Sequence, residues 1–132
     1  MSRDISKADT VLQELWPLLK AKYEERHPGR YLFLINVDRK PSEQLALFCQ
    51  GRLPDKPGPI VTYKDGYNNL SKHNADPSQA FDFGVMDGSK VVWPESYFED
   101  IGDMITMLDY GDEITWGGTF RSLKDCGHIE VH

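Results

Sequence analysis

The chain has 132 residues, of which 39% are hydrophobic and 27% are charged, as in ordinary soluble globular proteins. The net charge is −6 and the fifteen lysines and arginines are scattered, which argues against nucleic acid as a partner because phosphate binding needs clustered cations. No window is apolar over the length that spans a bilayer, so we expect no stable membrane binding. The length predicts a single domain over residues 1–132.

The cysteines and the N-terminus bear on where the protein folds. Cys49 and Cys126 are too few for a disulfide framework, and we expect free thiols in a reducing compartment. Residues 1–7 lack the apolar core of a secretory signal. We therefore expect a cytoplasmic protein until something else releases it. Nothing in the sequence demands an oligomer, so we expect a monomer.

The first half of the chain predicts helices around one strand, followed by a long loop. Residues 6–27 carry apolar side chains at helical spacing, and because Pro17 removes an amide donor we expect two consecutive helices there. The apolar run at residues 31–37 predicts a buried strand. Residues 41–51 predict a helix that begins at a proline. The proline- and glycine-rich residues 51–70 predict an irregular loop that faces substrate.

A β-hairpin is predicted in the middle of the second half. Apolar and polar residues alternate over residues 80–86, which places Asp82 on one face of a strand. The opposite face carries three apolar side chains: Phe81, Phe83 and Val85. The dipeptide Asp87-Gly88 predicts a tight turn, after which residues 90–93 return as the second strand.

The last part of the chain predicts one more helix and two short strands. Residues 94–110 carry an apolar stripe at helical spacing and predict a single helix. Residues 114–116 and 128–131 predict short strands. The complete order of elements predicts an α+β fold, in which a small antiparallel sheet is flanked by helices.

Two stretches of the chain supply side chains that can bind a metal ion. The first contains His73 and Asp82, and the second contains Asp125 and His128. A catalytic zinc site uses three protein ligands, often imidazole or carboxylate, and keeps a fourth position for water. A nearby carboxylate that is not a ligand can then act as general base. Spacing alone leaves open that His73 is a polar loop residue and that His128 is a strand residue bonded to its neighbours.

Four short motifs follow one another from about residue 39 to the end of the chain. They are Arg39…Gln44…Gln50-Gly51-Arg52, Ser71-Lys72-His73…Ala80-Phe81-Asp82, Trp116-Gly117-Gly118…Phe120 and Asp125-Cys126-Gly127-His128-Ile129-Glu130. Their order resembles that of peptidase family M15, the group of zinc D-Ala-D-Ala carboxypeptidases and L-alanyl-D-glutamate endopeptidases with a hedgehog-like zinc fold. The resemblance is closest to the phage endolysin branch. One departure is the spacing from His73 to Asp82, which is nine residues here and commonly seven in the family.

The resemblance implies a role for each matched residue. Three residues would be the zinc ligands: His73, Asp82 and His128. Asp125 would be the catalytic base, and Arg39 would stabilise developing negative charge or bind a substrate carboxylate. Three further residues would support the site or contact the substrate: Ser71, Gln44 and Glu130.

The function implied by the resemblance is that of a zinc metallopeptidase acting on peptidoglycan. We expect one catalytic domain, without a separate wall-binding domain, that hydrolyses the L-alanyl-D-glutamate bond of stem peptides from inside the cell for host lysis. A D-Ala-D-Ala carboxypeptidase or dipeptidase would share the zinc site and differ in pocket shape. A non-enzymatic binding domain would instead have a structural zinc closed by four protein ligands.

Overall fold

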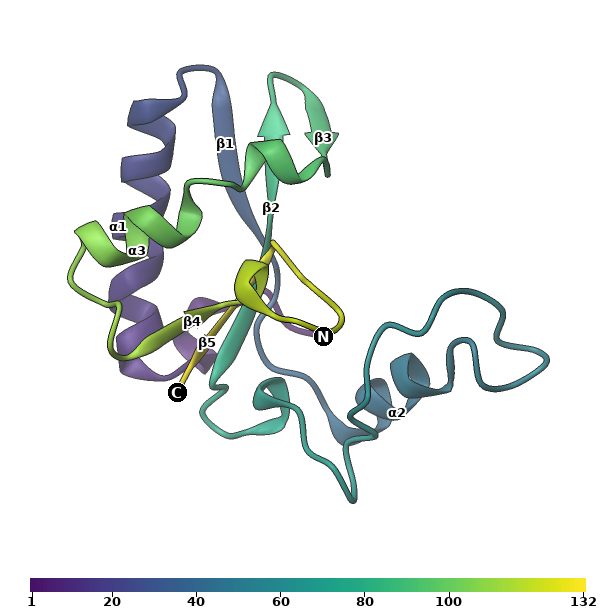
Figure 1. Ribbon diagram of the computed structural model, residues 1–132. Helices are drawn as coiled ribbons and strands as arrows, with labels where there is room; N and C mark the ends of the chain where they lie inside the picture. Colours follow the sequence, from purple (N-terminus) through teal and green to yellow (C-terminus); the bar gives the residue numbers. More distant parts are fainter.

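The computed structural model describes all residues 1–132 and has one antiparallel sheet at its centre (Figure 1). The strand order is β1-β2-β5-β4, and β3 also pairs with β2. The five strands are β1 (Arg30–Asn36), β2 (Ala80–Asp87), β3 (Lys90–Val92), β4 (Ile114–Trp116) and β5 (His128–Val131). The long strand β2 therefore pairs with β1 along one edge and with β3 and β5 along the other. The predicted α+β fold is confirmed.

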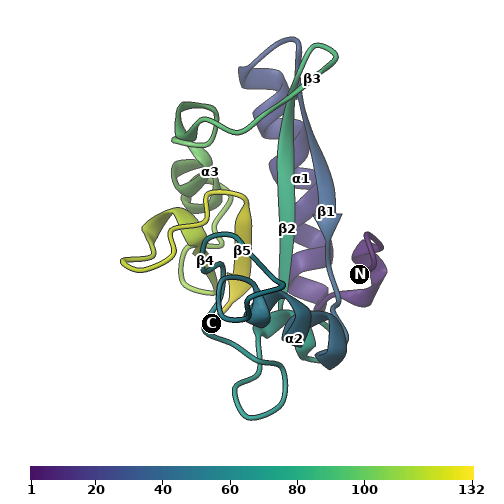
Figure 2. The same ribbon diagram turned by 90° about the vertical axis from the view of Figure 1, so that its right-hand side faces the viewer.

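The two faces of β2 differ as the alternation of its side chains predicts. Phe81, Phe83 and Val85 are fully buried in the hydrophobic core. The helices α1 (Thr10–Arg26) and α3 (Ile101–Met107) supply the other large apolar side chains of that core. Both views show α1 alongside β1 and β2 (Figure 1, Figure 2).

A different part of the chain does not pack on the sheet. The helix α2 (Pro41–Cys49) and the loop after it extend away from the sheet (Figure 1). No helix or strand occurs between residues 50 and 71, as the prolines and glycines there predict. None of the helices in the structure has both the length and the apolar character needed to cross a membrane.

The first helix corrects a prediction. A single helix, α1, replaces the expected pair, and Pro17 lies inside it on the exposed side. The missing amide costs about 3 kcal/mol in a helix interior. Four side chains on the other side are fully buried against the sheet: Leu12, Leu15, Leu19 and Tyr23. Because a break at Pro17 would separate these buried residues, packing keeps the helix continuous through the proline.

The predicted helix over residues 94–110 is also wrong in extent. A 3-10 turn at Glu95–Tyr97 is followed by the separate short helix α3. The carbonyl of Tyr97 accepts a hydrogen bond of 2.6 Å from the Tyr23 hydroxyl, and the amide of Ile101 binds the Phe98 carbonyl instead. Burial of Phe98 against Phe83, with ring centroids 5.7 Å apart, accompanies this break. Tertiary contacts here override an apolar stripe that suits a continuous helix.

The hairpin between β2 and β3 is confirmed, with its turn one residue later than predicted. Asp87 pairs with Lys90, so Gly88 and Ser89 form the two-residue loop. Gly88 has φ of +62°, the left-handed conformation that glycine adopts without strain.

The core prediction is tested by removing one ring from the buried face of β2. Phe83→Ala should lower the free energy of unfolding by about 3 to 5 kcal/mol, because Phe83 is fully buried among Trp16, Phe81 and Phe98. Tyr31→Ala, on the neighbouring strand but 51% exposed, should cost less than about 1 kcal/mol. Urea denaturation followed by circular dichroism measures both values. Equal losses would contradict this assignment of the two faces.

Candidate metal centre

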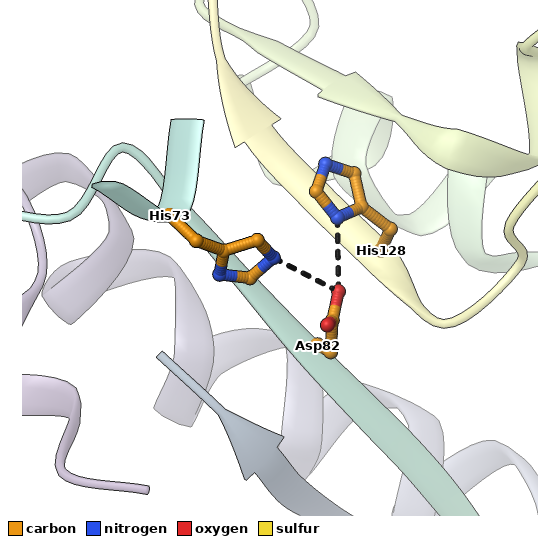
Figure 3. A group of neighbouring side chains, drawn as sticks. All are labelled: His73, Asp82 and His128. Carbon is orange, nitrogen blue, oxygen red and sulfur yellow. Dashed lines mark hydrogen bonds and ion pairs between the residues drawn. The ribbon is translucent and has the colours of Figure 1, made fainter. Parts of the chain in front are cut away.

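His73, Asp82 and His128 meet at one point on the sheet face opposite the core (Figure 3). One ligand atom from each residue lies within 4.8 Å of the others. Asp82 lies on β2, and His128 opens β5 directly opposite Asp82 in the strand register. His73 lies in a 3-10 turn, Lys72–Asn74, beside this strand pair. The structure thus brings together the three residues that the family resemblance implies as ligands.

His73 is held so that one ring nitrogen faces the cluster. The side chain is 2% exposed, and Nδ1 donates to the carbonyl of Val37 at 2.7 Å. This hydrogen bond leaves Nε2, 3.3 Å from Asp82 Oδ1, as the ring nitrogen with a free lone pair. Ser71 supports the turn, because its hydroxyl accepts a hydrogen bond from the His73 amide at 3.3 Å.

The turn between His73 and Asp82 accommodates the longer spacing. The carbonyl of Val37 accepts hydrogen bonds from both ends of this turn, from His73 Nδ1 at 2.7 Å and from Ser78 Oγ at 2.8 Å. The additional residues, which include Asp76-Pro77, lie between these two anchors. The spacing of nine residues therefore changes the length of the turn and leaves His73 beside Asp82.

The two oxygens of Asp82 face different partners. Oδ1 lies 2.9 Å from His128 Nδ1 and 3.3 Å from His73 Nε2. Oδ2 accepts hydrogen bonds from Asn36 Nδ2 at 2.9 Å and Arg39 Nη2 at 3.3 Å. Burial by itself would raise the pKa of Asp82, but the hydrogen bonds and charges of the two histidines lower it far below its usual range. The carboxylate thus remains ionised, as a metal ligand must be.

His128 lies between two carboxylates. Its Nδ1 faces Asp82, and its Nε2 lies 2.9 Å from Glu130 Oε1. Burial would lower the pKa of this imidazole, but the hydrogen bonds to Asp82 and Glu130 outweigh burial and raise the pKa to about 9. Glu130 therefore orients the ring from the side away from the cluster.

Arg39 connects the cluster to α2 and to the long loop. Its side chain is 9% exposed, and Nη2 binds Asn36 Oδ1 at 2.9 Å in addition to Asp82. Nη1 donates to Gln44 Oε1 at 2.7 Å, and Nε lies 3.3 Å from Met1 Sδ. Gln44 is fully buried, and its amide donates to the Lys64 carbonyl at 2.9 Å. Gln44 thus supports Arg39 from behind and has no surface for substrate.

Asn36 is the site residue that sequence reasoning missed. It ends β1, it is 7% exposed, and it lies opposite Asp82 in the strand register. Its amide group binds both Asp82 and Arg39. A buried asparagine at the end of an apolar strand is the signal that could have found it, because a buried amide must have partners.

Asp125 lies at the open side of the site. Its side chain is exposed, and one oxygen accepts a hydrogen bond from the Gly127 amide at 3.3 Å. The surrounding protein atoms and the negative charge of Asp82 raise the pKa of Asp125 above its usual value. Gly117 allows this placement, because a Cβ atom there would lie 2.2 Å from the Asp125 carbonyl oxygen.

A cavity of about 890 Å³ opens over the cluster. Seven of the eight residues implied by the resemblance line it: Arg39, Ser71, His73, Asp82, Asp125, His128 and Glu130. Gln44 lies behind its wall. Residues of the long loop also line the cavity, including Val61, Tyr63 and Leu70, so the loop that is predicted to face substrate borders this cavity.

The donor set fits a divalent transition ion. Two imidazole nitrogens and one carboxylate oxygen are ligands that zinc accepts in open three-residue sites. The His73 hydrogen bond to Val37 and the His128 contact with Glu130 are the outer contacts that orient histidine ligands. Cys126 is a half-buried free thiol that does not belong to the cluster, and Cys49 is also free.

The comparisons with known proteins show the fold. No family model matches the sequence. Among solved structures, the chain is similar to the Serratia marcescens L-Ala D-Glu endopeptidase ChiX, with a TM-score of 0.67 and 18% sequence identity. The match covers 97% of this chain and 83% of that protein. The two chains therefore share one α+β architecture, within which the cluster of His73, Asp82 and His128 lies.

Metal binding should depend on pH, because the pKa of His128 is about 9 and the ring must lose a proton to become a ligand. For protein stripped of metal with a chelator, zinc affinity should rise about tenfold per pH unit from about pH 7 to 9. Calorimetric titration in buffers of different ionisation enthalpy should detect release of about one proton per zinc. His132→Gln, which removes an exposed histidine, should not change this dependence.

The same raised pKa affects the stability of the stripped protein. A histidine whose pKa is higher when folded stabilises the fold fully below its unfolded value of about 6.5, and this contribution is lost as the pH rises through about 9. The melting temperature of the stripped protein should therefore fall across this range. A zinc affinity and a melting temperature that are both constant there would contradict the assignment of His128.

Proposed function

We propose that this protein is a zinc-dependent peptidase that hydrolyses the L-alanyl-D-glutamate bond of peptidoglycan stem peptides, and that it acts as an endolysin. The observation that supports this most is the three-residue cluster at the base of a large cavity. The cluster lies in a fold that matches an L-Ala D-Glu endopeptidase over 97% of the chain. The order of the motifs from Arg39 to Glu130 supports the same function.

A three-residue cluster favours catalysis over a structural role. A structural zinc site is closed by four protein ligands, whereas a catalytic site keeps one position for water. No fourth histidine, cysteine or acidic ligand joins His73, Asp82 and His128 in this structure. The cluster also faces an open cavity rather than the hydrophobic core.

The roles of the surrounding residues follow from their contacts. A zinc ion at the cluster would supply a Lewis acid for a water molecule and the scissile carbonyl. Asp125 accepts the proton of the attacking water and delivers it to the amide nitrogen that leaves, and its raised pKa suits both transfers. Arg39 and Asn36 hold Asp82 through its second oxygen, and Glu130 holds His128.

Digestion of purified murein tests the proposed reaction. Mass spectrometry should identify new free N-terminal D-glutamate, with L-alanine left on the muramyl side. Release of D-alanine alone would contradict the proposed bond and identify the protein as a carboxypeptidase. Absence of any product from zinc-loaded protein would overturn the proposed enzymatic activity.

Two variants should separate metal binding from catalysis. Asp125→Asn should keep zinc and lose activity by about 10²- to 10⁴-fold, because it removes the proton acceptor. His73→Ala should lose both zinc and activity, since it removes a ligand. Elemental analysis of zinc and a murein turbidity assay measure the two properties. Asp112→Asn, at an exposed carboxylate in the turn before β4, is the control and should change neither.

The proposed endolysin role predicts that lysis of the producing cells depends on access of the protein to the cell wall. Cells that produce the protein should stay intact until their inner membrane is permeabilised, and should then lyse. Rapid lysis by Asp125→Asn under the same conditions would show that lysis does not need the proposed peptidase.

A further inference from the structure

Two lysines line the cavity without an anionic partner. Lys64 belongs to the long loop, and Lys72 belongs to the 3-10 turn that also holds His73. No carboxylate lies within 4.0 Å of either ammonium group. The other cationic groups at the cavity wall are paired: Arg39 with Asp82, the Met1 ammonium with Glu43, and His128 with Asp82 and Glu130.

The backbone under each lysine is held in place. The Lys64 carbonyl accepts a hydrogen bond from the buried Gln44 amide at 2.9 Å, and its own amide donates to Thr62 Oγ1 at 3.0 Å. The Lys72 carbonyl accepts a hydrogen bond from the Gln79 amide at 3.0 Å. The two ammonium groups therefore extend from anchored positions on the cavity wall.

Lys72 lies close to the metal-binding cluster. Lys72 directly precedes His73 in the 3-10 turn, and it lines the cavity that opens over the three residues of the cluster. An anion bound by Lys72 would accordingly lie near the reacting centre.

Arg39 is poorly placed to bind an incoming carboxylate. Each of its three guanidinium nitrogens already has a partner within the chain, and the side chain is 9% exposed. A substrate carboxylate that displaced these contacts would remove support from Asp82. The free cations of the cavity are instead the two lysines.

Building on the proposed function, we infer that Lys64 and Lys72 form a subsite for the free carboxylate of the D-glutamyl residue at the scissile bond. A glutamyl residue carries two carboxyl groups, of which one continues the stem peptide and the other stays ionised beside the cleaved amide. Two ammonium groups that line one cavity attract such an anion locally, although the net charge of the protein is −6. The subsite would select acidic stem peptides over amidated ones.

A pair of synthetic stem peptides tests this subsite, one with the free D-glutamyl carboxylate and one with the carboxamide at that position. The wild-type protein should cleave the free acid with a kcat/KM about tenfold higher, as expected for two partly exposed ion pairs. The double variant Lys64→Gln/Lys72→Gln should lose this preference, mainly through a higher KM for the acid. Lys64→Arg/Lys72→Arg should retain it, because the charges remain.

The control variant removes the same charge elsewhere. Lys56→Gln/Lys90→Gln neutralises two exposed lysines outside the cavity and should keep the preference for the acid. If wild-type protein cleaves both peptides equally, or if the Lys64→Gln/Lys72→Gln variant retains the preference, the subsite is wrong and the proposed function stands.

Binding to the zinc-loaded Asp125→Asn variant separates the subsite from the reaction. Calorimetry should show tighter binding of the acid than of the amide, and the two lysine substitutions in this background should abolish the difference. If the protein binds the acid preferentially but the wild type does not cleave it, the subsite is supported and the proposed hydrolysis of the L-alanyl-D-glutamate bond is wrong. If the protein neither binds nor cleaves the peptides, both the subsite and the proposed function are wrong.

Discussion

The arrangement of this site depends on the two oxygens of the Asp82 carboxylate. One oxygen faces the histidines, and the other is held by Asn36 and Arg39. A buried carboxylate is costly unless its charge and its lone pairs have partners. The partners of Oδ2 come from the end of β1 and the segment after it, so Oδ1 can remain directed at the cluster. The contacts with Asn36 and Arg39 therefore both stabilise the charge of Asp82 and fix its orientation.

The sheet provides most of the precision of the site. Asn36, Asp82 and His128 lie on three neighbouring strands, in register with one another through β2. Strand pairing fixes such positions more tightly than loops do, because ladder hydrogen bonds determine the register. His73 is the exception, and its turn is attached to the end of β1 at the Val37 carbonyl. The three residues of the cluster are thus positioned by β2 and its two neighbours, β1 and β5.

The long loop is connected to this centre although it has no regular structure. Gln44 binds Arg39 with its oxygen and the loop backbone with its nitrogen, and it does so while fully buried. Loss of either partner would leave a buried polar group of Gln44 without a hydrogen bond, which would destabilise the folded protein. We therefore expect the loop, α2 and Arg39 to keep their relative positions. The loop that lines the cavity is accordingly linked to Arg39, which holds Asp82 of the cluster.

The sequence by itself determined the fold class, the faces of β2 and the residues of the cluster. These features are local or periodic: alternation places Asp82 opposite Phe81 and Phe83, and short ordered motifs carry the histidines. Only the tertiary structure decided the continuity of α1 through Pro17, the break before α3, and the contacts of Asn36, Arg39 and Gln44. Each of these depends on partners distant in sequence, such as Tyr23 for the Tyr97 carbonyl, and propensity contains no information about such partners. The position of Lys64 beside the cavity is of the same kind, because packing of the loop against Gln44 places it there.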